Sequence, residues 1–198
     1  MSIENNDSVI NFTSTDKILI AGKSGSGKST LMIELIKYLE PIYQEMTSRQ
    51  LGIKKSFIKI DPMMQFNGIP IRYGDRTAND EILKKMFQTA PEFIIEDEAD
   101  GFFPNKLTLS SVESDFINIG RPCGLGGMFI TRRLSNLNTN LVSNANKIFM
   151  FKLWQSADLR YLYNSNFGDF IPIVSRLEPY EFLYIDVDKN DYIVFDPI

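Results

Sequence analysis

The segment from Lys17 to Ile42 constrains the fold of this chain more than any other. It begins with an apolar run, "KILIA" (17–21), passes through the glycine-rich stretch "GKSGSGKS" (22–29) and continues as "STLMIELIKYLEPI" (29–42). In the last part, leucine and isoleucine recur at helical spacing, and Pro41 stands near the end. We therefore expect a buried strand, a glycine loop and a helix over 29–42, in that order.

This loop satisfies a specific phosphate-binding pattern. Gly22, Gly27, Lys28 and Ser29 match G-x-x-x-x-G-K-[ST] in the strand–loop–helix context that the pattern requires. Glycine lets successive backbone N–H groups turn toward an anion, and the following helix adds its positive end. Lys28 is expected to reach the β- and γ-phosphates, and the Ser29 hydroxyl to ligate magnesium. ATP and Mg²⁺ are thus the predicted cofactors, and the predicted nucleotide-binding residues are Gly22, Lys23, Ser24, Gly25, Ser26, Gly27, Lys28, Ser29 and Thr30.

The second motif is acidic. It follows an apolar run in "EFIIEDEAD" (92–100), where we expect another strand. Asp97 fits the carboxylate that supports the metal and its water shell. Glu98 would point to the opposite side of the strand, toward the γ-phosphate, and activate the attacking water. Glu96 occupies a position that is usually apolar, so it either shares the catalytic role or lies at a sheet edge.

The remaining elements alternate between strands and helices, which predicts an α/β domain with a largely parallel sheet. We treat residues 1–198 as one domain, with an N-terminal extension or strand over 1–15 and a C-terminal β-hairpin over 179–198. Further strands are expected at 56–62, 124–133 and 147–154, and helices at 80–90, after the cap-like Asn79-Asp80, and at 157–164.

Composition and missing motifs exclude several classes of protein. A single cysteine, Cys123, and no histidine exclude an internal disulfide and the usual zinc ligands. No apolar run approaches the ~18 residues of a membrane span, and the polar N-terminus does not resemble a secretory signal, so a reducing cytoplasm is expected.

Missing motifs exclude other P-loop proteins. The letters "DEAD" (97–100) occur in RNA helicases, but this chain lacks the second motor domain and the histidine-bearing motif of those enzymes. Transporter ATPases need a signature motif and a histidine that this chain also lacks. In "NKIF" (146–149), phenylalanine replaces the aspartate of GTPases. The net charge of −4 means that any DNA contact must be a local patch.

The stretch "FINIGRPCGLGGMFITRRLSNLNTNLVSNANKIFMFKL" (116–153) resembles the FtsK–HerA superfamily of DNA-pumping P-loop ATPases. The resemblance rests on the Gly120-Arg121 pair, the small-residue turn 124–127, the strand "MFIT" with Thr131, and the next apolar strand. It is strongest to the single-domain genome-packaging ATPases of tailless icosahedral viruses with double-jelly-roll capsids. It implies a RecA-like core working as a homo-oligomeric ring, with ATP held between subunits.

The resemblance also implies roles for individual residues. Arg121 corresponds to an arginine finger that acts on a neighbour's γ-phosphate, and Thr131 to a polar sensor of that phosphate. Arg132 stands where many relatives have glutamine, and Leu134 replaces their proline. Sensing therefore falls to Thr131 alone, or Arg132 itself touches phosphate or DNA; for Arg132 and Arg133 a surface ion pair is an equal alternative.

These features together predict an ATP-hydrolysing DNA translocase that packages a viral genome into a preformed capsid. Expected partners are double-stranded DNA, further copies of the chain and capsid vertex proteins, in the host cytoplasm and the virion. The alternatives are a filamentous-phage assembly or secretion ATPase and a small-molecule kinase, although a water-activating glutamate is a liability in a kinase. Candidate DNA contacts are residues 101–111, Arg72 and Arg76, whereas Phe102, Phe103 and Trp154 are expected in the core.

Overall fold

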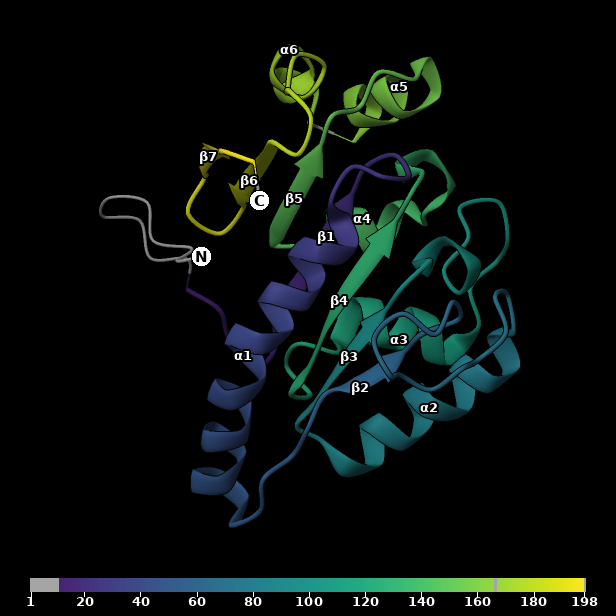
Figure 1. Ribbon diagram of the computed structural model, residues 1–198. Coiled ribbons are helices and arrows are strands. Elements are labelled where there is room, and N and C mark those ends of the chain that lie inside the picture. The colour runs from purple at the N-terminus through teal and green to yellow at the C-terminus, as the bar shows by residue number, and fades with distance from the viewer. Residues whose placement is uncertain (1–10, 166, 198) are drawn as a thin grey trace.

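The computed structural model describes residues 11–165 and 167–197. In these residues seven strands form one sheet in the order β2-β3-β4-β1-β5-β6-β7 (Figure 1). The strands are β1 (Lys17–Ala21), β2 (Ile58–Ile60), β3 (Glu92–Glu96), β4 (Leu125–Thr131), β5 (Lys147–Phe151), β6 (Phe182–Asp186) and β7 (Asp191–Phe195). The first five strands in sheet order pair in parallel, and β6 and β7 add an antiparallel hairpin. The predicted α/β fold with a mostly parallel sheet and a C-terminal hairpin is confirmed.

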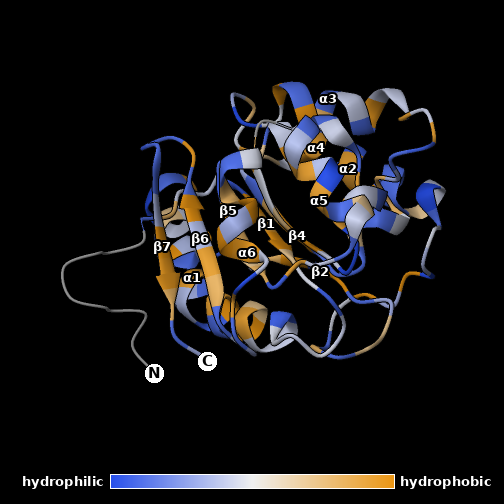
Figure 2. Ribbon diagram, turned by 90° about the horizontal axis from the view of Figure 1, so that it is seen from above, coloured by the Kyte–Doolittle hydropathy of each residue, from blue (hydrophilic) through white to orange (hydrophobic). Residues whose placement is uncertain are grey.

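Helices cover both faces of this sheet. The helices are α1 (Lys28–Leu51), α2 (Arg76–Thr89), α3 (Ser111–Ile119), α4 (Thr139–Ser143), α5 (Ser156–Asn164) and α6 (Ile171–Val174). One core joins α1 to one face of the strands, and a second core joins the other helices to the opposite face. Because both faces are covered, the central strands are buried along their whole length and mostly apolar, which Figure 2 shows as orange strands between helices of mixed colour. The polar exceptions, such as Lys17 and Lys147, lie at strand ends.

The strand order places the phosphate loop at the centre of the sheet. β1 lies between β4 and β5, and β3 is separated from β1 by β4. In parallel strands the carboxyl ends meet at one edge, so the ends of β1, β3 and β4 converge there. This carboxyl edge is the usual ligand-binding edge of such sheets.

The first helix is longer than predicted. It continues through Pro41 to Leu51 and ends at Gly52, whose φ of 71° is left-handed. Proline removes one helical hydrogen bond, but tertiary contacts beyond it hold the helix. The Tyr43 hydroxyl donates to the Pro91 carbonyl at 3.0 Å, and the Thr47 hydroxyl accepts from the Lys55 backbone at 3.0 Å.

Other boundaries also differ from prediction. Helix α2 begins at Arg76, because the Asp75 side chain caps it by accepting from Ala78 N at 3.1 Å; the expected start at 79–80 was wrong. The strands are shorter than expected at their carboxyl ends, where the chain turns into the site. Of the predicted extension or strand over 1–15, residues 1–10 lie outside the described residues, 11–13 have no regular structure and 14–15 form a turn.

Two of the three aromatic residues predicted to lie in the core are buried, and one is exposed. Phe102 and Phe103 are fully buried, as predicted, whereas Trp154 is 59% exposed just after β5, so its assignment to the core was wrong. Within the described part of the chain, no helix combines the length and apolarity that a bilayer crossing requires.

Candidate nucleotide-binding site

The loop between β1 and α1 forms a tight, glycine-dependent turn at the centre of the carboxyl edge. Gly22 N donates to the Thr131 carbonyl at 3.3 Å, which ties the start of the loop to the end of β4. A Cβ at Gly22 would lie 2.7 Å from the Phe151 Cβ and 2.9 Å from the Ser26 Oγ, so only glycine fits there. Gly27 adopts φ 104°, which L side chains rarely take, immediately before α1 begins.

Lys28 is folded back over this loop. It is buried, and its Nζ donates to the Lys23 carbonyl at 2.8 Å. Burial lowers the pKa of Lys28 to about 8; the nearby Glu98 and Asp97 charges oppose that shift, and Arg132 adds to it. The phosphate loop, both carboxylates and Arg132 therefore share one electrostatic environment.

The loop carries a polar group suited to a phosphate. The buried Ser26 Oγ has no hydrogen-bond partner among the described residues. A buried hydroxyl without a partner is costly, and a phosphate oxygen in the loop would satisfy it. The Ser29 Oγ lies at the mouth of the loop, where it donates to the Gln65 Oε1 at 3.3 Å. These observations fit a bound nucleoside triphosphate.

The donors near Ser29 also fit magnesium. Ser29 and Asp97 offer hard oxygen atoms, which Mg²⁺ prefers. Among the described residues no group of three or more His, Cys, Asp or Glu side chains is arranged to hold a metal. Magnesium in a phosphate site is usually held by one or two protein oxygens together with phosphates and water.

Asp61 is a site residue that the sequence argument missed. It follows β2 directly beside Asp97, whose backbone N donates to the Ile60 carbonyl at 3.2 Å. Asp61 is fully buried; its Oδ2 accepts from Phe66 N at 2.6 Å, and its Oδ1 has no partner among the described residues. Burial raises the pKa of Asp97, and the Asp61 charge adds to that shift. In the sequence, "IDP" (60–62) marks only the end of a predicted strand, and the position of Asp61 beside Asp97 depends on the pairing of β2 with β3.

Glu98 lies in the site, but not for the reason expected. Strand β3 ends at Glu96, so strand alternation does not orient Glu98. Instead Glu98 takes the left-handed φ of 54°, uncommon outside glycine, and its backbone N donates to the Asp97 Oδ1 at 3.0 Å. Its carboxylate forms an ion pair with Arg132. Burial raises the pKa of Glu98, while Arg132 opposes the shift.

Glu96 is separated from this arrangement by the sheet geometry. It is fully buried at the end of β3, an interior strand, so the alternative that it lies on an edge strand of the sheet is wrong. Both carboxyl oxygens lack hydrogen-bond partners among the described residues, and burial raises the pKa of Glu96 well above its ordinary value. Its share in catalysis stays a prediction.

Thr131 is fixed at the end of β4. Its hydroxyl donates to the Asp100 Oδ1 at 2.9 Å and accepts from Arg133 N at 3.2 Å. Tyr73 donates to the other Asp100 oxygen at 3.2 Å. Thr131 is fully buried, so these bonds hold the strand end in place; its role as a phosphate sensor stays a prediction.

Arg121 lies at the opposite edge of the sheet. It follows α3, near the first residue of β1, Lys17, whose pKa its charge lowers. The five residues of β1 place that edge roughly 16 Å from the phosphate loop. Its side chain is 42% exposed and lies 3.6 Å from Asp188 in the β6–β7 turn. Arg121 therefore faces away from its own loop, and its action on a neighbour stays a prediction.

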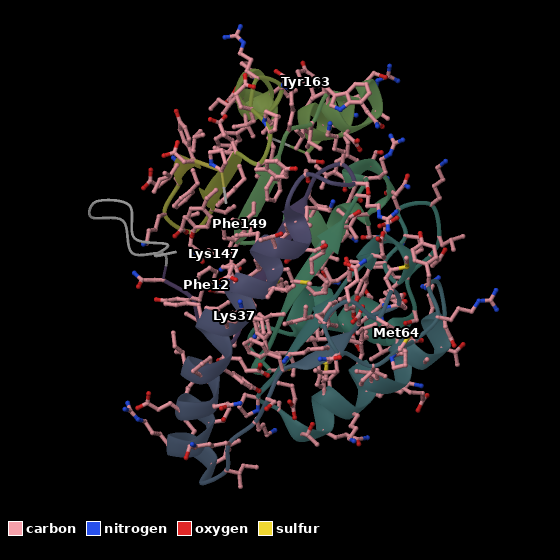
Figure 3. All side chains as sticks on the ribbon, in the orientation of Figure 1. Phe12, Lys37, Met64, Lys147, Phe149 and Tyr163 are labelled. Atoms are coloured by element: carbon pink, nitrogen blue, oxygen red, sulfur yellow. The ribbon has the colours of Figure 1, made fainter. Side chains whose placement is uncertain are left out.

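The candidate DNA contacts are not equivalent. Arg76 forms a two-point ion pair with the fully buried Glu113, Nε to Oε1 at 2.8 Å, and donates to the Thr108 carbonyl at 2.9 Å, so it serves the α2–α3 junction. Arg76 is therefore already paired within the subunit, which weakens it as a candidate DNA contact. Arg72 is exposed, on the loop that also carries Met64, labelled in Figure 3. Cys123 is a free, exposed cysteine.

Comparison with known proteins places this fold. No protein-family model and no curated protein sequence matches the chain. The fold is similar to the genome packaging NTPase of Sulfolobus turreted icosahedral virus 2 in complex with AMPPCP, with a TM-score of 0.74 and 21% identity over 94% of this chain and 100% of that one. It also matches the N-terminal domain of zonular occludens toxin from Neisseria meningitidis (TM-score 0.54, 14% identity, 93% of this chain and 95% of that one). A third match is the cytoplasmic domain of the type VII secretion ATPase EccC of Thermomonospora curvata (TM-score 0.54, 14% identity, 93% and 25%). The fold that the resemblance implied, that of viral packaging ATPases and their relatives, is thus confirmed.

Proposed function

We propose that this chain is an ATP-hydrolysing motor that moves DNA into a viral capsid, working as a ring of identical subunits. The observation that carries the proposal is the convergence of Lys28, Asp97 and Glu98 at the centre of the carboxyl edge, with Arg121 exposed at the other edge. The fold shared with a viral genome packaging NTPase supports the choice of DNA packaging among the activities of P-loop proteins.

The chemistry assigned to each residue follows from its position. The loop N–H groups and Lys28 bind the phosphates, and Ser29 and Asp97 hold magnesium, which when bound neutralises charge on the phosphates. Glu98 accepts a proton from water as the water oxygen bonds to the γ-phosphorus and the bond to the β-phosphate oxygen breaks. The buried surroundings of Glu98 strengthen its interaction with that water.

Arg121 completes the site from another subunit. A guanidinium near the γ-phosphate stabilises the charge that develops as the bond breaks. Because Arg121 cannot reach its own loop, a head-to-tail ring is the arrangement that brings it to a nucleotide. A capsid vertex is the expected docking partner of such a ring, and Arg72 is the remaining basic candidate for DNA.

The decisive experiment measures ATP hydrolysis at increasing protein concentration, with and without double-stranded DNA. We expect specific activity to rise with concentration, as sites assemble between subunits, and to rise further with DNA. Phosphate transfer to an added nucleoside would instead establish a kinase. Concentration-dependent hydrolysis without any response to DNA would favour an assembly or secretion ATPase.

A paired substitution tests the assignment of the base. Glu98→Gln should retain ATP binding and lose turnover by roughly 10²–10⁴-fold. Glu96→Gln is the matched control, because it replaces a neighbouring carboxyl group that faces the α2–α3 side of the sheet. If Glu98→Gln keeps its turnover and Glu96→Gln loses it, Glu96 is the base.

A further inference from the structure

A pocket of about 500 Å³ lies between the β6–β7 hairpin and the segment that runs from the end of α5 through α6. We call it the hairpin pocket. Its apolar wall is formed by Phe167, Phe170 and Ile173 of that segment and by Ile185 and Tyr192 of the hairpin. The Phe170 and Tyr192 rings meet edge to face, with their centroids 5.4 Å apart. A pocket of this size can enclose a side chain from another molecule.

The rim of the hairpin pocket is acidic. Asp169 and Asp191 line it, and both are exposed. Asp191 accepts from its neighbouring backbone N, that of Tyr192, at 2.8 Å. The ion pairs of the hairpin involve Asp186 and Asp188 instead, so both rim carboxylates lack a cationic partner among the described residues. Aromatic rings beside unpaired carboxylates favour a cation that is carried on or next to an apolar group.

The hairpin pocket lies at the amino edge of the sheet, beside the residue proposed to act on a neighbour. The end of β6, which contributes Ile185 to the pocket, pairs with the start of β5. Asp188, in the same β6–β7 turn, is the ion-pair partner of Arg121. The pocket is therefore on the side of the subunit that the proposed ring turns toward the next nucleotide site.

An exposed tip at the carboxyl edge matches this pocket in chemistry. The tip is Lys106-Leu107, in the loop before α3, and it lies between two anchored points. On one side Asn105 N donates to the Asn136 carbonyl at 2.7 Å, and on the other the Thr108 carbonyl accepts from Arg76 at 2.9 Å. The leucine is 58% exposed, and the lysine is exposed without an ion-pair partner among the described residues. Because the loop is anchored, the tip loses little conformational freedom on binding.

The tip and the pocket belong to the same face of the sheet. Phe102 and Phe103, which anchor the loop of the tip, are part of the same core as Ile185, and Phe167 and Phe170 pack against that core. A head-to-tail ring brings the amino edge of each subunit against the carboxyl edge of the next. Two features on one face, at opposite edges, are brought toward each other by that arrangement.

We propose that the tip of one subunit docks in the hairpin pocket of the next, with Leu107 against the aromatic rings and the Lys106 ammonium between Asp169 and Asp191. The inference rests on the proposed head-to-tail ring and names a contact that holds it together. The tip and the pocket flank the two halves of the shared nucleotide site, so the contact also sets the distance between those halves.

Sedimentation velocity of the full chain, with AMPPCP and without DNA, measures the contact. Asp191→Lys and Lys106→Asp should each raise the protein concentration at which rings form by about tenfold or more, because each change places like charges together. The two changes combined exchange the charges and should restore assembly to within about threefold of the unaltered chain. Leu107→Ser should weaken assembly without changing any charge.

Two charge reversals outside the tip and the pocket are the matched controls. Asp196→Lys follows the other end of β7, and Lys85→Asp lies on α2; both side chains are exposed. Neither should change the concentration at which rings form. Thermal unfolding and AMPPCP affinity, measured by calorimetry, should be the same in all variants as in the unaltered chain, which excludes misfolding as the cause of weaker assembly.

The outcomes separate this contact from the function on which it rests. Rings that form equally well in every variant, or a combined variant that assembles no better than the single ones, overturn the contact and leave the ring standing. A loss of DNA affinity in Lys106→Asp with unchanged assembly also overturns it and makes the tip a DNA contact. An unaltered chain that binds AMPPCP but stays monomeric at every concentration contradicts the ring itself, and the contact with it.

Discussion

The carboxyl and amino edges of the central sheet both carry charged side chains, but these side chains are bonded in opposite ways. At the carboxyl edge, bonding is incomplete: buried oxygen atoms of Ser26 and Asp61 have no partners among the described residues, and Glu98 is held in a left-handed conformation. At the amino edge, buried polar groups are bonded to one another. The same strands carry both edges, so the difference lies in the residues at the strand ends and in the loops that join them.

The amino edge is a buried polar network between the first residues of β1 and β5 and the end of β6. Lys147 Nζ lies 2.6 Å from the Asp186 Oδ1, and both side chains are almost fully buried. Asn146 accepts from Lys17 N at 2.8 Å and donates to Asp16 and Asp188 at 2.8 and 2.7 Å. Figure 3 labels Lys147 on β5, two residues before Phe149.

The contrast shows that the amino edge contributes to stability, whereas the carboxyl edge keeps polar groups available for a ligand. A bonded, buried network fixes the register of three strands, whereas unfilled bonding capacity is what a ligand can satisfy. Substitutions at the carboxyl edge should therefore change chemistry, and substitutions at the amino edge should change stability. Arg121, exposed at the rim of the amino edge, is the proposed exception.

The largest expected effect tests that exception. Arg121→Ala should lower ATP turnover by roughly 10³–10⁵-fold while leaving nucleotide affinity and thermal stability almost unchanged, because the side chain is exposed and remote from its own loop. Arg160→Ala, another exposed arginine, is the control for loss of surface charge. Mixing Arg121→Ala with Glu98→Gln subunits should restore part of the activity, because some sites then combine an intact base with an intact arginine. Turnover by Arg121→Ala at the unaltered rate would contradict the role.

The next effect is on stability. Asp186→Ala leaves the Lys147 ammonium buried without its main partner and should lower the free energy of unfolding by about 3–5 kcal/mol, measured by urea denaturation. The control is Glu34→Ala, which breaks a pair with Lys37 whose side chains are 37% and 65% exposed and should lower the free energy of unfolding far less than Asp186→Ala does. Equal losses for the two variants would remove the distinction between network and surface.

A pH titration sharpens the same comparison. Burial lowers the pKa of Lys17 to about 8 from an ordinary 10.5, so between these values the unfolded chain binds more protons than the folded chain. The free energy of unfolding should therefore rise with pH across this window, by about 1–3 kcal/mol from Lys17. Lys17→Met should remove this part of the rise, and an unchanged profile in that variant would contradict the assignment.

Above the window the sign reverses. Burial raises the pKa values of Tyr43, Tyr161 and Tyr184, so above about pH 10 the unfolded chain loses protons that the folded chain keeps. The free energy of unfolding should therefore fall above about pH 10. The rise that comes from Lys17 can be measured only below that pH.

Some parts of the site could be predicted from the sequence and others could not, for a physical reason. The phosphate loop and Asp97 were predictable because phosphate binding demands a fixed local pattern. Asp61 and the contact between Glu98 and Arg132 were not, because they depend on which strands lie side by side. The order β2-β3-β4-β1 brings the ends of separate segments together, and no local spacing encodes that order. The extent of α1 beyond Pro41 likewise depended on tertiary contacts.

The smallest expected effect links the two edges. Asp188 lies 3.6 Å from Arg121 and accepts a hydrogen bond from Asn146, so Asp188→Asn removes the charge attraction and keeps an acceptor for Asn146. For so exposed a pair, the free energy of unfolding should change by less than about 1 kcal/mol. If Arg121 leaves Asp188 to reach a neighbouring subunit, this variant should reach half-maximal ATPase activity at a lower protein concentration, by a factor of about 2–5, since less than about 1 kcal/mol is released per interface. A measurable loss of activity would instead mean that Asp188 positions Arg121, and the two edges would then be coupled through the hairpin within each subunit.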